Sequence, residues 1–227
     1  MLTGIDLSHW NTIANYNALE QTGLAFAYIK ATQSDQITDP AMATHYHGIS
    51  TTHILTGFYH FYAVGVDPVA QAQHFCDSIK PYLDQYSLPP ALDIEDETNT
   101  IPVATLIQDT QIFLDKVKEL TGYLSMFYSN KPFIMNRLGG TKQFSGYPLW
   151  LACYEPNPST PLAGWNAPKI WQYSDKSLNS GQPTDGDLWY GDAADMLSFT
   201  NAPSFKDGSS PSDWVTKYNI KILGTQS

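Results

Sequence analysis

Short apolar segments alternate with longer segments of helical periodicity along the first 140 residues of the chain. The short segments are rich in β-branched and aromatic residues and are bounded by turn residues, which is typical of strands. We predict eight strands, at residues 3–8, 24–31, 54–62, 90–95, 123–128, 148–154, 168–173 and 191–199. Helices are predicted between the early strands, at residues 12–22, 39–51, 67–85 and 102–121. This alternation favours parallel pairing through right-handed crossovers.

The pattern changes beyond residue 140. The segments 155–167 and 174–190 are rich in Pro, Gly, Asn, Ser and Asp and have no helical period, so we predict loops there. The expected fold class is α/β, a modified TIM-type barrel with five β/α units followed by three strands with few helices. We expect residues 1–200 to form this barrel. Residues 201–227 form a C-terminal tail that is either linker-like or packed on the barrel.

The charge balance excludes some classes of partner. Twelve basic and 22 acidic residues give a net charge of -10, which argues against nucleic acid and against anionic membrane surfaces. We find neither an apolar run long enough to span a membrane nor a signal peptide, so we expect a chain made in the cytoplasm. Cys76 and Cys153 match no metal or redox spacing, and whether they pair stays open.

Four carboxylates lie within five residues in the segment PPALDIEDETN, residues 89–99. Asp93 and Glu95 are two apart on a predicted strand, so both project from the same face. Active sites of β/α barrels lie at the C-terminal ends of the strands, where this pair falls. The alternative is a solvated strand end or a helix cap. Asp96 and Glu97 are expected to be solvated loop charges.

Two further carboxylates could join this pair. Asp6 ends the first predicted strand, and Asp195 lies in the eighth, which becomes its neighbour when the barrel closes. Four carboxylates around one opening would raise at least one pKa by repulsion and desolvation. A protonated acid beside an ionised carboxylate is typical of a glycosidase. A capping role for Asp6 and a surface position for Asp195 are the alternatives.

Aromatic residues gather near the ends of the predicted strands. Rings with an apolar face and a polar edge suit sugars. The candidate substrate-binding residues are Tyr62, Tyr128, Trp150, Tyr154, Trp171 and the adjacent Gln172. His45, His47 and His53 lie close together but match no strong zinc signature, so no metal and no cofactor are expected.

Ordered motifs then identify a family. The segments GIDLSHWN, FAYIKATQ, GFYHF, ALDIE, FYSN, LWLACY and IWQYSD, in this order, resemble glycoside hydrolase family 25, the lysozymes also called N-acetylmuramidases. The resemblance spans residues 4 to about 199. It implies cleavage of the β-1,4 bond between N-acetylmuramic acid and N-acetylglucosamine in peptidoglycan, by five β/α units followed by three strands.

The resemblance also implies roles for the acids. Glu95 corresponds to the general acid and Asp93 to its partner, while Asp6 and Asp195 correspond to supporting acids. The last strand of the family usually reads V-D-x-N; in AADMLSF, Asp195 matches the Asp, and Leu197 replaces the Asn. Retention and inversion of the sugar both stay open.

Several alternatives remain at this stage. A barrel that binds glycan without cutting it, a chitinase-like glycosidase, and a hydrolase with a metal held by DIEDE would each account for part of the pattern. The expected partner is peptidoglycan, and the expected state is a monomer. A phage lysin, an autolysin and a secreted effector, acting on the wall after release, are equally compatible with the sequence.

Overall fold

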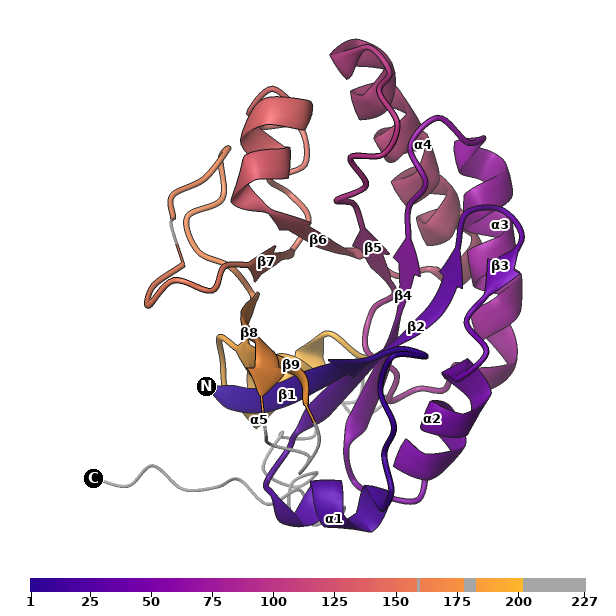
Figure 1. Cartoon of the computed structure of the whole chain (residues 1–227), viewed down its shortest axis with the longest axis vertical. Helices are drawn as coiled ribbons and strands as arrows, with labels where there is room; N and C mark the ends of the chain where they lie inside the picture. Colours follow the sequence, from indigo (N-terminus) through magenta and orange to yellow (C-terminus); the bar gives the residue numbers. More distant parts are fainter. Residues whose placement is uncertain (159, 178–182, 202–227) are drawn as a thin grey trace.

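Eight strands close into a barrel in the computed structural model, which describes residues 1–158, 160–177 and 183–201 (Figure 1). The barrel strands are β1 (Leu2–Leu7), β2 (Phe26–Gln33), β4 (Leu55–Phe61), β5 (Ala91–Asp93), β6 (Met126–Asn130), β7 (Leu149–Ala152), β8 (Ile170–Ser177) and β9 (Thr184–Trp189). Their order is β1-β9-β8-β7-β6-β5-β4-β2, and pairing of β1 with β2 closes the ring. The short β3 (Ile37–Thr38) pairs with β2 outside the ring. The predicted barrel is confirmed.

Strand direction differs in one part of the barrel. β1, β2 and β4 to β8 run parallel to their neighbours, whereas β9 runs antiparallel to both β1 and β8. Because β9 is antiparallel, its first residues lie at the C-terminal ends of the other strands. Its N-terminal residues therefore reach the end of the barrel at which sites are expected.

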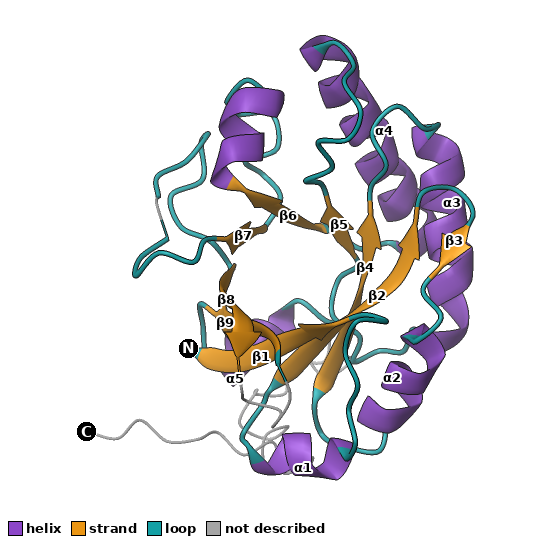
Figure 2. Cartoon of the chain, viewed as in Figure 1, coloured by secondary structure: helices purple, strands orange, loops and turns teal. Residues whose placement is uncertain are grey.

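The helices cover one side of the barrel. They are α1 (Tyr16–Gln21), α2 (Met42–Ile49), α3 (Pro68–Ile79) and α4 (Val103–Thr121), with a 3-10 turn at Lys80–Tyr82, a π-helical turn at Phe133–Arg137 and the short α5 (Ala193–Ser198). In Figure 2, α2, α3 and α4 flank β2, β4 and β5, while loops flank β7. Local signals fix the ends: Asp67 caps α3 ahead of Pro68, and Gly122 ends α4 at φ 79°.

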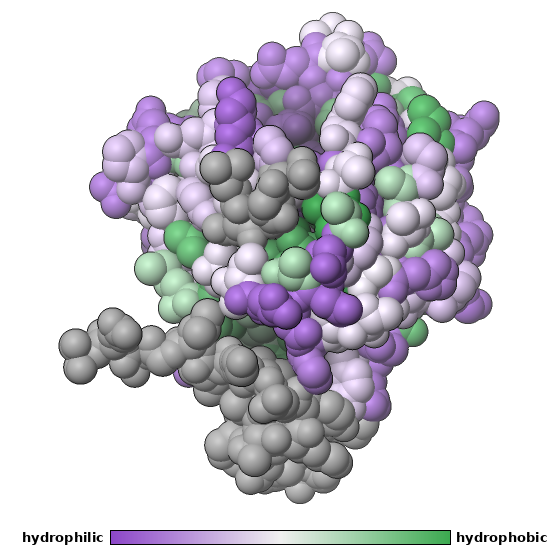
Figure 3. Space-filling view, turned by 60° about the horizontal axis from the view of Figure 1, so that its bottom comes forward, coloured by the Kyte–Doolittle hydropathy of each residue, from purple (hydrophilic) through white to green (hydrophobic). Residues whose placement is uncertain are grey.

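Two apolar clusters build the core. One fills the layer between strands and helices and includes Ile29, Phe58, Phe113 and Phe127. The other fills the barrel and includes the residues Phe26, Tyr28, Tyr59, Met126, Trp150, Ile170 and Trp189. Bulky rings inside the barrel leave a packed interior and not a pore. On the face of the molecule shown in Figure 3, most residues are hydrophilic or of intermediate hydropathy, and hydrophobic residues form small patches among them.

The eighth predicted strand, 191–199, is wrong. Residues Ala193–Ser198 form α5, whose start is capped by Asp192. Ala193, Met196 and Leu197 are buried on one face of α5 at helical spacing. The last barrel strand is β9, which falls within the segment 174–190 that we predicted as a loop.

Three further expectations concern the tail, membrane-spanning helices and the two cysteines. The predicted tail lies, from residue 202 onward, outside the described residues. None of the described helices combines the length and the hydropathy that crossing a membrane would need. Cys76 and Cys153 are both free thiols.

Candidate active site

An acidic pocket of about 190 Å³ opens at the C-terminal ends of the parallel strands. It is lined by Asp6, Ser8, Trp10, Lys30, Tyr59, Phe61, Asp93, Glu95, Tyr128, Trp150, Gln172 and Asp185. These residues come from most of the barrel strands or directly follow them. The pocket therefore exists only when the barrel is closed.

Asp93 and Glu95 reach the pocket from the end of β5. Asp93 is buried, and its Oδ1 has no hydrogen-bond partner in the described part of the chain. Burial raises the pKa of Asp93 well above its ordinary value, and repulsion from Glu95 adds to this shift. Burial also raises the pKa of Glu95. The Asn130 amide donates to Glu95 Oε2 at 3.4 Å and lowers the pKa of Glu95 in part. Both groups therefore hold protons at higher pH than free carboxyls do.

A second group of carboxyls lies across the barrel, on β1 and β9. Asp6 faces Asp185 in the antiparallel register, and Asp187 follows two residues later on the same face of β9. Burial, followed by repulsion between these carboxyls, raises the pKa of Asp6 well above its usual value and raises the pKa of Asp187 to about 8. Hydrogen bonding with Asp6 opposes part of the rise in the pKa of Asp185 and of Asp187. Adjacent buried carboxyls can form such bonds only when one of them carries a proton.

A polar chain connects these carboxyls to the rim. The Gln172 amide donates to Asp6 Oδ2 at 2.8 Å, and Gln172 Oε1 accepts from the hydroxyls of Tyr128 and Tyr154, each at 3.0 Å. Gln172 and Tyr128 are buried, whereas Tyr154 is 57% exposed. The amide therefore has both of its ends occupied, and its orientation is fixed.

Lys30 is the only Lys or Arg among the described residues that line the pocket. Its ammonium lies 4.7 Å from the centre of the Phe61 ring and donates to Gln33 Oε1 at 2.9 Å. Burial lowers the pKa of Lys30, while the charge of Lys30 lowers the pKa values of Asp93 and Glu95. One cation thus offsets part of the repulsion in the pocket.

The structure brings together most of the residues predicted to form a site. Asp6, Asp93, Glu95, Tyr128, Trp150 and Gln172 line the pocket, and Tyr154 contacts it through Gln172. Three predicted residues lie elsewhere. Asp195 is on α5, where it accepts from Lys169 Nζ at 2.9 Å and from Trp189 Nε1 at 2.6 Å.

Tyr62 and Trp171 are also outside the pocket. Tyr62 is fully buried in the layer between strands and helices, next to His60 and Phe113. Trp171 alternates with the inward-facing Gln172, so it lies on the outer face of β8, where its Nε1 donates to the carbonyl of Cys153 at 2.6 Å. Both rings lie away from the pocket because side chains along a strand face the pocket only at alternate positions.

Sequence reasoning missed Asp185, Asp187, Lys30 and Tyr59. The segment TDGDLW carries the same D-x-D spacing that pointed to Asp93 and Glu95, and the apolar LW follows it, so a signal was present. With β9 as the last strand, the family pattern V-D-x-N falls on residues 184–187, with Asp185 at the Asp and Asp187 at the Asn. Lys30 and Tyr59 lie in quoted motifs, and their inward orientation depends on the register of the barrel.

The proposed metal alternatives have no counterpart in the described residues. Asp96 turns away from Asp93 and Glu95 and accepts from the backbone N–H of Val64 and Thr98. His45 bonds to Tyr16 and to the Ser8 carbonyl, and His53 bonds to Glu20. Within the described part of the chain, no group of three or more His, Cys, Asp or Glu could hold a metal ion.

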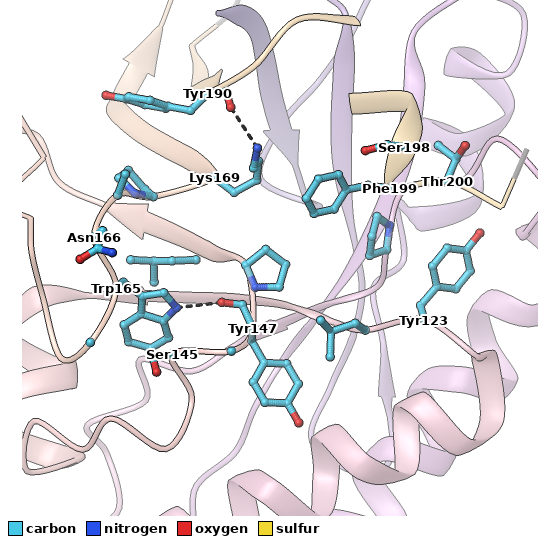
Figure 4. A pocket seen from close by; sticks show the side chains of 18 of the residues that line it. Tyr123, Ser145, Tyr147, Trp165, Asn166, Lys169, Tyr190, Ser198, Phe199 and Thr200 are labelled. Carbon is cyan, nitrogen blue, oxygen red and sulfur yellow. Dashed lines mark hydrogen bonds between the residues drawn. The ribbon is translucent and has the colours of Figure 1, made fainter. Parts of the chain in front are cut away.

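A larger pocket, of about 780 Å³, opens at the opposite end of the barrel (Figure 4). Most of its lining residues lie just before β5, β6, β7 and β8 or follow β9. Trp165 Nε1 donates to the Tyr147 carbonyl and Lys169 Nζ to the Tyr190 carbonyl. Among the described residues, its lining contains no Asp or Glu that could donate a proton to a glycosidic oxygen.

The acidic pocket has the groups that glycoside hydrolysis needs. Glu95 is a carboxyl of raised pKa at the pocket surface, and Asp93, Asp6 and Asp185 are further carboxyls within the same opening. One protonated acid together with ionised carboxylates can protonate a leaving oxygen and stabilise an oxocarbenium-like state. The exposed Trp10 ring, 83% exposed, lies at the edge of this opening.

Comparisons with known proteins agree with this chemistry. The sequence model of the glycosyl hydrolases family 25 matches residues 5–182. An N,O-diacetylmuramidase of Chalaropsis sp is 30% identical over 190 residues, which cover 78% of this chain and 90% of the relative. A lysozyme structure from Streptomyces coelicolor gives a TM-score of 0.82 at 25% identity, covering 88% of this chain and 97% of its own. A muramidase structure from Trichobolus zukalii gives 0.81 at 27% identity, covering 88% and 99%.

Proposed function

The chain belongs to the glycosyl hydrolases of family 25, and from this membership we propose a lysozyme mechanism in which Glu95 is the proton donor. The protein is a glycoside hydrolase of the lysozyme class, and its substrate is peptidoglycan. The bond cleaved is the β-1,4 bond between N-acetylmuramic acid and N-acetylglucosamine. We propose that it acts at the cell wall, where this polymer lies.

One observation carries the assignment of the site. Glu95 follows β5 and is half-buried, so it can reach substrate while burial raises its pKa, whereas its neighbour Asp93 in the same pocket is buried. A carboxyl that keeps its proton beside ionised neighbours is the requirement for a general acid at near-neutral pH. The described lining of the larger pocket, at the other end of the barrel, includes no Asp or Glu that could act as this acid.

The reaction follows from these positions. Glu95 transfers its proton to the glycosidic oxygen as the bond between this oxygen and C1 of the muramic acid residue breaks. Positive charge develops at C1 and the ring oxygen, and the carboxylate of Asp93 stabilises it. A water molecule supplies the new oxygen at C1 and returns one proton to a carboxylate, which restores the starting protonation.

Supporting roles go to residues across the barrel. We assign to Asp185 the supporting role that the sequence had given to Asp195, because Asp185 lines the pocket opposite Asp6. Asp6 accepts from the Gln172 amide, which connects it to Tyr128 and Tyr154. These two hydroxyls and Gln172 are therefore proposed to contact the sugar substituents.

Aromatic rings at the opening supply contact area for the glycan. Trp10 and Tyr154 are 83% and 57% exposed, and Trp10 lines the pocket. Exposed rings with a polar edge are suited to pack against sugar faces. All carboxyls of the pocket come from one chain, which supports our proposal that the enzyme works as a monomer.

A substrate comparison tests this function. Purified peptidoglycan and soluble chitin oligosaccharides are incubated with the enzyme, and new reducing ends are measured. We expect reducing ends from peptidoglycan and none above background from chitin. Release from chitin alone would make the protein a chitinase, and binding of peptidoglycan without new reducing ends would make it a binding module.

A further inference from the structure

Asp187 is a buried carboxyl that lies beneath the acidic pocket. Its side chain is fully buried inside the barrel on β9. Oδ1 accepts a hydrogen bond from Trp150 Nε1 at 2.8 Å, but Oδ2 has no donor among the residues that the structure describes. A buried carboxylate oxygen without a donor costs the desolvation energy of a charged group, so the ionised form is strongly disfavoured here.

The groups around Asp187 make ionisation still less favourable. Asp185, two residues away on β9, repels a second negative charge at Asp187, and Asp187 in turn raises the pKa of Asp6 on β1 by repulsion. Tyr28 on β2 and Trp150 on β7 are neutral, and Gln172 on β8 is its partner in the antiparallel register. No ion pair links Asp187 to a Lys, Arg or His of the described residues.

A proton on Oδ2 would remove both difficulties. The carboxyl would then be neutral, and its O–H could donate to the carboxyl of Asp6, the neighbour on β1 that interacts with Asp187. We propose that Asp187 is a positioning residue, held as the neutral acid, that donates this proton to Asp6 and thereby orients the pocket. The proposal rests on the proposed function only for its effect on turnover.

The consequence for the pocket follows from the polar chain. With one acceptor site of Asp6 occupied by Asp187, Asp6 Oδ2 accepts from Gln172 Nε2. Gln172 is then oriented with Oε1 toward the hydroxyls of Tyr128 and Tyr154. Asp187 therefore acts on the substrate through Asp6 and Gln172 without reaching the pocket, whose lining does not include it.

Two variants separate the donor role from a packing role. Asp187→Asn keeps an oxygen that accepts from Trp150 and an N–H that donates to Asp6. Asp187→Leu has a similar volume and can do neither. We expect the Asn variant to keep kcat within about threefold of the wild type, and the Leu variant to lose about tenfold or more in kcat with little change in KM.

A spectroscopic measurement tests the protonation state independently of activity. Chains labelled with ¹³C at the aspartate carboxyls are titrated by NMR, and the Asp187 resonance is assigned by its loss in the Asn variant. We expect the chemical shift of a neutral acid at pH 6. This measurement also decides the proposal if the Leu variant does not fold.

Each result supports or overturns the proposal. An ionised Asp187 at pH 6 would overturn it, as would an Asn variant that loses as much kcat as the Leu variant, or a Leu variant with wild-type kcat. If the wild type does not cleave peptidoglycan, the proposed function fails, whereas the NMR titration still tests the neutral acid at Asp187.

Discussion

Asp6 on β1 lies directly opposite Asp185 on the antiparallel strand β9. Like charges at opposite positions of neighbouring strands destabilise a sheet. Two ionised carboxylates at these positions would therefore oppose folding, and both residues line the acidic pocket. We interpret this unfavourable pair as a requirement of the chemistry and not of the fold.

The position of the supporting acid can be tested with two matched variants. Asp185→Asn removes a carboxyl of the pocket, and we expect kcat/KM to fall at least about tenfold with little loss of stability. Asp195→Asn changes a residue of α5 that bonds Lys169 and Trp189, so we expect normal activity and a loss of about 1 kcal/mol in the free energy of unfolding.

Steady-state kinetics and urea unfolding of both variants check this prediction. Normal activity of Asp185→Asn together with inactive Asp195→Asn would show that the last strand had been assigned correctly from sequence and wrongly from the structure.

Lys30 influences the pH at which Asp93 and Glu95 lose their protons. Its charge lowers the pKa values of Asp93 and Glu95, so Lys30→Met should raise both. Because Glu95 would then keep its proton to higher pH, we expect the alkaline limb of the kcat/KM profile to move to higher pH. Lys118→Met, an exposed residue on α4, is the control and should leave the profile unchanged. A downward shift in Lys30→Met would contradict the electrostatic account.

Stability should fall as the pH rises above 6.5. The pKa of Asp187 is raised by burial to about 8, so the folded chain keeps a proton that the unfolded chain has released. Such a group contributes stability below its ordinary pKa that is lost as the pH approaches its folded pKa. His45 and His60, whose pKa values are lowered by burial, act in the opposite direction only below about pH 6.5.

Thermal unfolding between pH 6.5 and 8.5 measures this effect. We expect the melting temperature of the wild type to fall over this range, and the fall to be smaller in Asp187→Asn. Identical pH dependence in the two proteins would show that Asp187 does not hold a proton in the folded state.

Gly57 permits close contact between β4 and β2. A Cβ at this position would lie 2.3 Å from the ring of Tyr28, which is buried and donates to the Pro89 carbonyl. We expect Gly57→Ala to cost about 1–3 kcal/mol of unfolding free energy, because the ring has no space to move. Gly146→Ala is the control, since nothing lies within 4 Å of its Cβ, and chemical denaturation of both variants measures the difference. Equal stability of the two variants would contradict this packing argument.

The first seven strands and the first four helices were predictable because their local signals agree with the fold. Buried parallel strands read as continuous apolar runs, and Pro68 and Gly122 mark helix ends. The pair Asp93 and Glu95 was predictable for the same reason: a two-residue spacing at the end of an apolar strand places both carboxyls on one face.

The last strand was not recognised because its signals conflict. The segment containing β9 has Gly, Asp and Pro, which are typical of loops, and its buried face carries Asp185 and Asp187 in place of apolar residues. By contrast, the apolar residues of 193–198 suit a short helix as well as a strand. Charges inside a barrel are unfavourable for folding alone, so reasoning from hydropathy discards the residues that matter for chemistry.

The orientation of rings was the other limit. Phe61 and Gln172 face the pocket. Tyr62 directly follows Phe61, and Trp171 directly precedes Gln172. A shift of one residue moves a side chain to the other face of the sheet. Sequence position near a strand end was therefore sufficient to identify the region but not the face.

The central claim is that Glu95 is the proton donor of a muramidase. Glu95→Gln keeps the shape of the side chain and removes the acid, whereas Glu97→Gln changes an exposed carboxyl two residues away. Purified peptidoglycan is digested with the wild type and both variants, reduced with borohydride, and analysed by mass spectrometry. We predict fragments ending in reduced muramic acid from the wild type and from Glu97→Gln, and none from a folded Glu95→Gln. Wild-type amounts of these fragments from Glu95→Gln would contradict the account.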